Sequence, residues 1–144
     1  MASGRQNVGV TNPSWGNPVT GVRPASGNTA AEHFAYLLSV ETDCADVRVA
    51  MSLEDPGFTL LDVRSTDSFA AGHLPGAVSM PHDQITVHSL AGYPQDELFV
   101  VYCAGPHCNG ADRAALRLAR LGRPVKKMIG GITGWQDEGY PLEP

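Results

Sequence analysis

Three local patterns follow one another in the stretch Val100-Val101-Tyr102-Cys103-Ala104-Gly105-Pro106-His107-Cys108-Asn109-Gly110-Ala111-Asp112-Arg113. Residues 98–102 are mostly apolar, with β-branched and aromatic side chains, and predict a short buried strand. Glycine, proline and asparagine within residues 103–110 predict a loop. Apolar residues recur at helical spacing over 111–121, and Gly122 and Pro124 follow where a helix would end. The stretch therefore predicts a strand, a loop and a helix in direct succession.

Cys103 lies at the carboxyl end of this predicted strand. Loop amides and a helix N-terminus both present positive partial charge at such a position. A thiol placed there ionises below its usual pKa of about 8.5, toward roughly 3.5–7.5. Because the thiolate is the reactive form, Cys103 is a candidate nucleophile for covalent catalysis. The alternative from these residues alone is a buried, small, apolar side chain.

The length and composition fit one globular domain. The chain has 144 residues, of which 42% are hydrophobic and 17% charged. No apolar run approaches the roughly 20 residues that span a bilayer, and residues 1–7 lack the apolar core of a secretory signal. The three cysteines favour a reducing, cytoplasmic location without a disulfide framework. The net charge of −5 and the lack of a basic cluster argue against nucleic-acid binding, and no membrane partner is expected.

The N-terminal region differs in composition from the rest. Residues 1–28 contain five glycines and three prolines and predict a flexible or irregular arm. Trp15 either docks this arm on the domain or on a protein partner, or is incidental. The sequence Thr29-Ala30-Ala31-Glu32 is a capping-box pattern and predicts an additional helix over residues 29–40. The domain itself is expected to cover residues 29–144.

Strand and helix patterns alternate from about residue 41 onward. The strand patterns lie at residues 41–42, 58–64, 77–80, 98–102 and 125–129. The helical patterns lie after Asp43 to about Leu53, around Phe69 and Ala70, after His82, over 111–121 and over 132–138. This alternation predicts an α/β architecture with a mainly parallel sheet and helices on both faces.

Four segments resemble the single-domain rhodanese-like sulfurtransferases and occur in the order found in that family. They are Leu60-Leu61-Asp62-Val63-Arg64, then Gly72-His73-Leu74-Pro75-Gly76-Ala77, then the strand, Cys103 loop and helix, then Gly130-Gly131-Ile132-Thr133-Gly134-Trp135. The resemblance covers about residues 41–144. It implies a five-stranded parallel sheet between helices, with the arm and the first helix as additions.

The resemblance also implies an activity. The Cys103 thiolate would attack the outer sulfur of thiosulfate or of a similar small anionic donor, and the resulting persulfide would pass its sulfur to a thiol or to cyanide. Backbone amides of the loop would hold the anion and the persulfide. The expected substrate-binding residues are Ala104, Gly105, Pro106, His107, Cys108, Asn109, Gly110 and Arg113. This chemistry requires no metal or organic cofactor.

Several residues outside the loop are expected to support the fold. Asp62 resembles the family's aspartate at that strand end and either pairs with Arg64 or holds neighbouring backbone. Ser68 stands where the family usually has an acidic residue, so Asp67 is a second possible partner for Arg64. His73 is expected to be a structural hydrogen-bonding group. The glycine pair at 130–131 is expected to let backbone pass close to the cysteine loop, because glycine tolerates such approaches.

The cysteine loop departs from the family pattern. It is longer than the common loop and lacks the basic residue found in many members, which leaves His107 as its titratable base. Arg113 could attract an anion, although the first turn of a helix disfavours a cation. Cys108 either closes a disulfide or polysulfide bridge with Cys103 on oxidation, or is a structural thiol that points inward.

Three other functions involve different chemistry. A persulfide carrier or partner-binding module would have the same fold with slow turnover. A phosphatase or arsenate-reductase-like enzyme would need an arginine six positions after Cys103 to clamp an oxyanion, and Asn109 stands there. A zinc site of Cys103, His107 and Cys108 would crowd its ligands into one loop, unlike a closed tetrahedral site, so no metal is expected.

Overall fold

The computed structural model describes residues 9–144, so the first eight residues of the predicted arm lie outside the described residues. The chain divides into two compact units, with the boundary between Ala35 and Tyr36. In the first unit, the Asn17 side chain accepts hydrogen bonds from the backbone N–H groups of Val19 and Thr20, each at 2.9 Å. These bonds form a side-chain-stabilised turn. Trp15 is 61% exposed, and a protein partner for this arm stays a prediction.

Helix α1 spans Gly27–Val40, so it begins two residues before the predicted start at Thr29. The Ser26 hydroxyl, 3.2 Å away, accepts a hydrogen bond from the Thr29 backbone N–H. Ser26 therefore caps the helix, and the expectation that Thr29 is the cap is wrong. A serine at the N-cap satisfies an amide that otherwise lacks a partner in the first turn.

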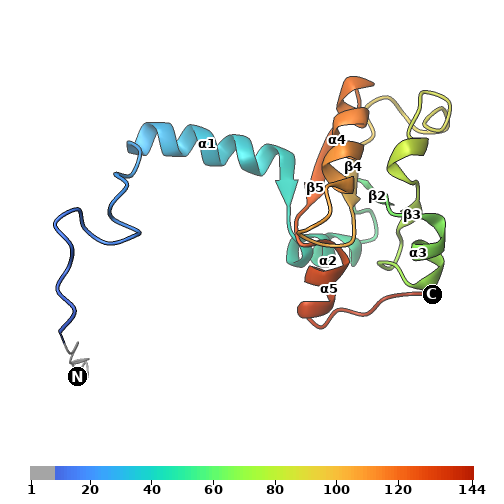
Figure 1. Cartoon of the computed structure of the whole chain (residues 1–144). Coiled ribbons are helices and arrows are strands. Elements are labelled where there is room, and N and C mark those ends of the chain that lie inside the picture. Colours follow the sequence, from blue (N-terminus) through green and yellow to red (C-terminus); the bar gives the residue numbers. More distant parts are fainter. Residues whose placement is uncertain (1–8) are drawn as a thin grey trace. The chain divides into compact units, whose positions relative to one another are not determined.

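Five parallel strands form the sheet of the second unit (Figure 1). They are β1 (Glu41–Thr42), β2 (Thr59–Asp62), β3 (Val78–Ser79), β4 (Phe99–Tyr102) and β5 (Val125–Met128). Their order is β1-β5-β4-β2-β3, with every neighbouring pair parallel. This arrangement confirms the predicted α/β fold, and it puts β4 in the centre of the sheet.

Four α-helices and one short 3-10 helix follow the strands of this unit. They are α2 (Cys44–Met51), α3 (Thr66–Ala71), η1 (His82–Gln84), α4 (Gly110–Arg120) and α5 (Gly131–Asp137). The predicted cap of α2 is confirmed, since the Asp43 carboxylate, 2.8 Å away, accepts the Asp46 backbone N–H. Between residues 9 and 144, no helix combines the length and the apolar character that crossing a bilayer requires.

The side chains of β4 alternate between two apolar layers, as successive residues of a strand must. Phe99 and Val101 pack with residues of α4 on one face of the sheet. Val100 and Tyr102 pack with residues of α2 and α5 on the other face. Helices therefore cover both faces, and β4 is buried along its whole length.

The segment after His82 differs from the prediction of a helix followed by a loop. Only the three residues of η1 are helical there. The Thr86 hydroxyl accepts a hydrogen bond from the Ser89 backbone N–H at 3.1 Å. The Ser89 hydroxyl accepts one from the Thr86 backbone N–H at 2.9 Å. Such local bonds offer the backbone an alternative to a helix, which explains why the helix does not continue.

Candidate active site

Cys103 follows directly after β4, at the carboxyl edge of the parallel sheet. In open α/β sheets, ligands bind at this edge, because loops from neighbouring strands meet there. Cys103 is only 6% exposed over the whole residue. It nevertheless lines two cavities, so it borders space that a small molecule can occupy.

Hydrogen bonds from the start of α5 hold the cysteine loop in place. The Ile132 N–H donates a hydrogen bond to the Cys103 carbonyl at 3.1 Å. The Ala104 carbonyl accepts two more, from the N–H of Thr133 at 3.0 Å and from its hydroxyl at 3.1 Å. Within the loop, the Cys108 N–H donates to the Gly105 carbonyl at 3.1 Å. The loop is therefore held at its base and folded back on itself.

The predicted close approach to this loop is confirmed for Gly131 of the glycine pair. An added Cβ at Gly131 would lie 2.5 Å from the Cys103 carbonyl oxygen and 2.8 Å from the Gly105 nitrogen. Gly131 also has a φ of +60°, a conformation that residues with a side chain rarely adopt. Only glycine satisfies both constraints at this position.

We expect Gly131→Ala to lower the free energy of unfolding by roughly 2–5 kcal/mol, the combined cost of left-handed backbone and overpacking. Gly139 is a matched control, because its φ is +79° and an added Cβ there meets nothing within 4 Å. Gly139→Ala should cost only the backbone part, about 1–2 kcal/mol. Urea unfolding of both variants measures the difference, and equal losses would contradict the proposed close contact.

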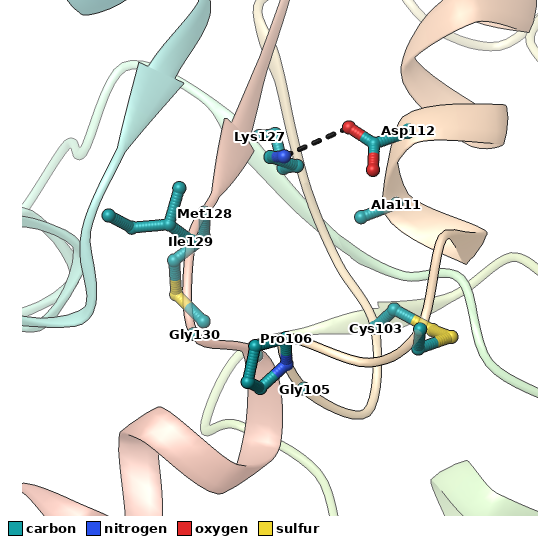
Figure 2. A pocket seen from close by; sticks show the side chains of 11 residues that line it. Cys103, Gly105, Pro106, Ala111, Asp112, Lys127, Met128, Ile129 and Gly130 are labelled. Carbon is teal, nitrogen blue, oxygen red and sulfur yellow. Dashed lines mark hydrogen bonds and ion pairs between the residues drawn. A yellow bond between two sulfur atoms is a disulfide. The ribbon is translucent and has the colours of Figure 1, made fainter.

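The first cavity lies between the cysteine loop, α4, β5 and the glycine pair (Figure 2). It has a volume of about 210 Å³. Cys103, Pro106 and Cys108 contribute from the loop, and Lys127 contributes from β5. The second cavity, of about 440 Å³, lies toward β2 and η1, and its lining includes Arg64, Ser65, Ser68, His82, Asp83, Ala104, Asn109 and Gly110 besides the two cysteines.

Lys127 supplies a cation that the sequence analysis did not identify. Its Nζ lies 2.9 Å from Asp112 of α4 (Figure 2). It also lies 3.4 Å from Glu41 of β1. The hydrogen bond with Asp112 and the charges of both carboxylates raise the pKa of Lys127, against the opposing effect of burial. The signal was a lysine pair inside a strand pattern, but only the position of β5 beside β4 brings Lys127 to the cavity.

Asp62, at the end of β2, is fully buried and accepts hydrogen bonds from two side chains. Its Oδ2 lies 2.7 Å from Arg64 Nη2 and 2.7 Å from the Tyr102 hydroxyl. The Tyr102 hydroxyl in turn accepts the Leu74 N–H at 3.1 Å, and Arg64 also donates to the Gly72 carbonyl at 2.6 Å. This network ties β2, β4 and the turn after α3 together, so Asp62 holds the framework of the site.

The network changes the ionisation of its members. Burial raises the pKa of Tyr102, and the charge of Asp62 adds to that effect, so the hydroxyl stays protonated as a donor. Burial alone would lower the pKa of Arg64, but the hydrogen bond and charge of Asp62 outweigh it, and the net direction is upward. Of the two acidic partners considered for Arg64, the structure places Asp62 in the ion pair.

His73 has the structural setting that the sequence suggested. Its Nδ1 lies 2.9 Å from the Phe69 carbonyl, and its ring stacks on the Phe69 ring with a centroid distance of 3.7 Å. Its backbone N–H and carbonyl both pair with Glu143, each at 2.8 Å. His73 therefore connects α3 with the C-terminal segment.

Two predicted binding residues lie outside the linings of the two cavities. His107 is exposed at the tip of the loop. Arg113 is also exposed, and its Nε donates to the Asn109 side-chain oxygen at 3.1 Å. Asn109 thus pairs with a guanidinium on the first turn of α4, and the binding roles of His107 and Arg113 stay predictions.

Cys103 and Cys108 form a disulfide bond (Figure 2), with their Cα atoms 6.5 Å apart. Of the two alternatives for Cys108, the structure shows the bridge to Cys103. The Gly110 N–H donates to Cys108 Sγ at 3.4 Å. A Cβ added to Gly110 would lie 2.7 Å from Cys103 Sγ, so this glycine leaves the space that the two sulfur atoms fill.

The third cysteine, Cys44, is buried at the start of α2, and its Sγ lies 3.5 Å from the Ile129 carbonyl oxygen. Burial raises the pKa of Cys44, and the charges of Asp43 and Glu138 raise it further. In the reduced protein at about pH 8, near the usual thiol pKa, we expect iodoacetamide to modify Cys44 more slowly than Cys103 or Cys108. Peptide mass spectrometry measures the three rates, and equal rates in the folded chain would contradict this prediction.

The same pKa shift affects stability at high pH. The folded chain keeps a proton on Cys44 that the unfolded chain releases, so this stabilising contribution is present below the ordinary thiol pKa and is lost as pH rises through the folded value. Cys44→Ala should therefore flatten the alkaline decrease in the free energy of unfolding.

Fold and site together define a single-sheet α/β protein with a cysteine nucleophile candidate on the loop after its central strand. Residues 46–138 match the family model described as the rhodanese-like domain. The chain therefore belongs to the rhodanese-like domain family.

Solved structures agree with this assignment. The crystal structure of the BH2092 protein from Bacillus halodurans is 36% identical, with a TM-score of 0.79 over 82% of this chain and 86% of that chain. The rhodanese-like domain of the Alr3790 protein from Anabaena sp., solved by NMR, is 27% identical, with a TM-score of 0.64 over 72% of this chain and 77% of that chain.

Two curated relatives are similar over somewhat more than half of the chain. The HTH-type transcriptional regulator Rv0324 of Mycobacterium tuberculosis is 38% identical over 86 residues, which are 59% of this chain and 37% of the regulator. A sulfurtransferase of Allochromatium vinosum is 30% identical over 83 residues, which are 58% of this chain and 76% of that protein. The match thus spans little more than a third of the length of the regulator.

Proposed function

We propose that the protein is a sulfurtransferase that moves a sulfane sulfur from thiosulfate, or a similar small anionic donor, to a thiol or cyanide through a persulfide on Cys103. The observation that carries this proposal is the position of Cys103, on a fixed loop at the end of the central strand and bordered by two cavities. The similarity to a sulfurtransferase of Allochromatium vinosum supports it.

The reaction starts from the reduced loop, in which the bond between Cys103 and Cys108 is open. The Cys103 thiolate attacks the outer sulfur of thiosulfate, the bond between the two donor sulfurs breaks, and sulfite leaves. Cyanide or a thiolate then attacks the outer sulfur of the Cys103 persulfide. The bond from that sulfur to Cys103 breaks, and the thiolate is restored.

Positive charge for the donor comes mainly from the backbone. The two cations that line the cavities, Lys127 and Arg64, are each already paired with carboxylates. The Gly110 N–H donates to Cys108 Sγ, and α4 begins at Gly110. The N-terminus of a helix attracts anions, so these amides supply the preorganised electrostatic stabilisation.

The test uses the full chain, reduced and then freed of reductant. Thiocyanate formation from thiosulfate and cyanide reports the transfer. Mass spectrometry after thiosulfate alone should find the added mass of one sulfur atom on the Cys103 peptide of a chain whose Cys108 is replaced by serine. If neither thiocyanate nor the added sulfur forms, the proposal is wrong.

A second candidate is a persulfide-carrying module with slow turnover. It is favoured by the similarity to Rv0324, which is named as a transcriptional regulator. A stable persulfide on Cys103 without measurable thiocyanate formation would identify this role. A phosphatase or arsenate-reductase-like role has less support, because Asn109 stands where that chemistry needs an arginine.

A further inference from the structure

We propose that Cys108 is a second catalytic residue, which attacks the Cys103 persulfide and releases the transferred sulfur as hydrosulfide. This inference rests on the proposed function, because it requires a persulfide on Cys103. In the first turnover, this step would release the sulfur as hydrosulfide without cyanide or an added thiol as acceptor. The chain would then convert the sulfane sulfur of thiosulfate to sulfide.

The first argument is the reach of the Cys108 sulfur. The two Sγ atoms are bonded in this structure, so the backbone of the loop allows Cys108 to meet Cys103 at its sulfur atom. The turn closed by the Cys108 N–H and the Gly105 carbonyl folds residues 103–108 back on themselves. Gly110 leaves room for both sulfurs, since a Cβ there would be 2.7 Å from one and 3.4 Å from the other.

The second argument is the surroundings of the attacking atom. Cys108 Sγ accepts a hydrogen bond from the Gly110 N–H at 3.4 Å, and it lies two residues before the start of α4. Both features favour the thiolate, which is the attacking form in thiol–disulfide exchange. Cys44 also stands at a helix start, but it is buried, and burial raises its pKa.

The third argument is a route for the leaving group. Attack at the inner sulfur of the persulfide displaces the outer sulfur, which must have space to depart. Cys103 and Cys108 both line the second cavity, of about 440 Å³, and also the smaller one. The departing hydrosulfide therefore has open space beside both cysteines.

The step balances in atoms and electrons. The Cys108 thiolate bonds to Cys103 Sγ, the bond from that atom to the outer sulfur breaks, and the outer sulfur leaves as hydrosulfide with the persulfide proton. The sulfane sulfur gains two electrons, which the two cysteines lose as they form the disulfide. A dithiol reductant then reopens the bridge by thiol–disulfide exchange and becomes oxidised itself. The sum is thiosulfate and a dithiol converted to sulfite, hydrosulfide, a proton and the oxidised dithiol.

A single-turnover experiment tests the proposal. The full-length chain is reduced, freed of reductant under anaerobic conditions and mixed with thiosulfate, without cyanide or added thiol. We expect the wild-type chain to release sulfite and sulfide in equal amounts and to end with Cys103 and Cys108 joined. In Cys108→Ser we expect sulfite release and a persistent persulfide on Cys103, with sulfide release lost. Cys44→Ala is the matched control and should behave as the wild type.

The outcomes separate the two proposals. If wild type and Cys108→Ser both release sulfite and both keep the persulfide, without sulfide, the role of Cys108 is overturned while the sulfurtransferase proposal stands. If Cys108→Ser forms no persulfide and releases no sulfite, the sulfurtransferase proposal fails, and the Cys108 step fails with it. Sulfide released by Cys108→Ser at the wild-type yield would also overturn the role of Cys108.

Discussion

Cys103→Ser is expected to lower the rate of thiocyanate formation at least about 10³-fold, the scale seen when a catalytic nucleophile is removed. A serine hydroxyl at this position cannot form a persulfide, so the intermediate disappears altogether. Thiocyanate formation from thiosulfate and cyanide measures the rate. Intact mass after thiosulfate alone measures the intermediate, compared between Cys108→Ser and a chain that carries both Cys103→Ser and Cys108→Ser, because the wild-type chain is expected to consume its persulfide. Thermal unfolding of the variant shows whether the fold is kept, because Cys103 is only 6% exposed.

The neighbouring thiol provides the comparison. Cys108→Ser should keep at least part of the cyanide-dependent transfer, because cyanide can take the sulfur from Cys103 directly. The buried thiol gives a second control, and Cys44→Ala should keep the transfer as well. If Cys108→Ser were inactive and Cys103→Ser active, Cys108 would be the nucleophile, and our assignment would be wrong.

Asp62→Ala is expected to lower the free energy of unfolding by about 3–5 kcal/mol, the usual cost of removing one partner of a buried ion pair. Asp62 is fully buried, and the side chain of its partner Arg64 is 13% exposed. The substitution leaves the guanidinium without its carboxylate and the Tyr102 hydroxyl without its acceptor. Urea unfolding measures the loss, and a change below about 1 kcal/mol, typical of an exposed pair, would contradict the structural role.

Two further measurements divide this effect into parts. Tyr102→Phe removes one hydroxyl and leaves the Leu74 N–H unpaired, at an expected cost of about 1–3 kcal/mol. The interaction between Asp62 and Arg64 is measured by a double-mutant cycle. Asp62→Asn combined with Arg64→Met removes the unpaired charge, so the double variant should lose less stability than the two single losses added together. Simple additivity would show that the two side chains do not interact.

Much of the fold could be predicted from local patterns. The apolar run at 98–102, the glycine-rich loop and the helical spacing that follows each correspond to β4, the cysteine loop and α4. Asp43 was correctly identified as a cap, because an N-cap acts within its own helix turn. Thr29 was not, since Ser26 offers the same hydroxyl three residues earlier and a sequence pattern alone does not rank the two.

The same limit explains the segment after His82. Its apolar residues are compatible with a helix, but the side chains of Thr86 and Ser89 each accept a hydrogen bond from the backbone N–H of the other residue. Which of the two arrangements wins depends on how the chain packs, for example on Ile85 and Leu90, both buried in the core beside α4. In this segment the helical pattern and the local side-chain hydrogen bonds are both compatible with the sequence, and tertiary packing determines which of them forms.

By itself, the sequence determined that this is a parallel α/β domain with Cys103 at the end of a buried strand. Those features depend on residues close together in the chain. Only the tertiary structure decided that Lys127 reaches the cavity, that Arg64 pairs with Asp62 and that Cys108 bonds to Cys103. For Lys127, the physical reason is that β5 lies beside β4, which brings a side chain distant in sequence to the cavity. The other two pairs are close in sequence, but their local patterns allowed other partners, and the packed position of each side chain decides between them.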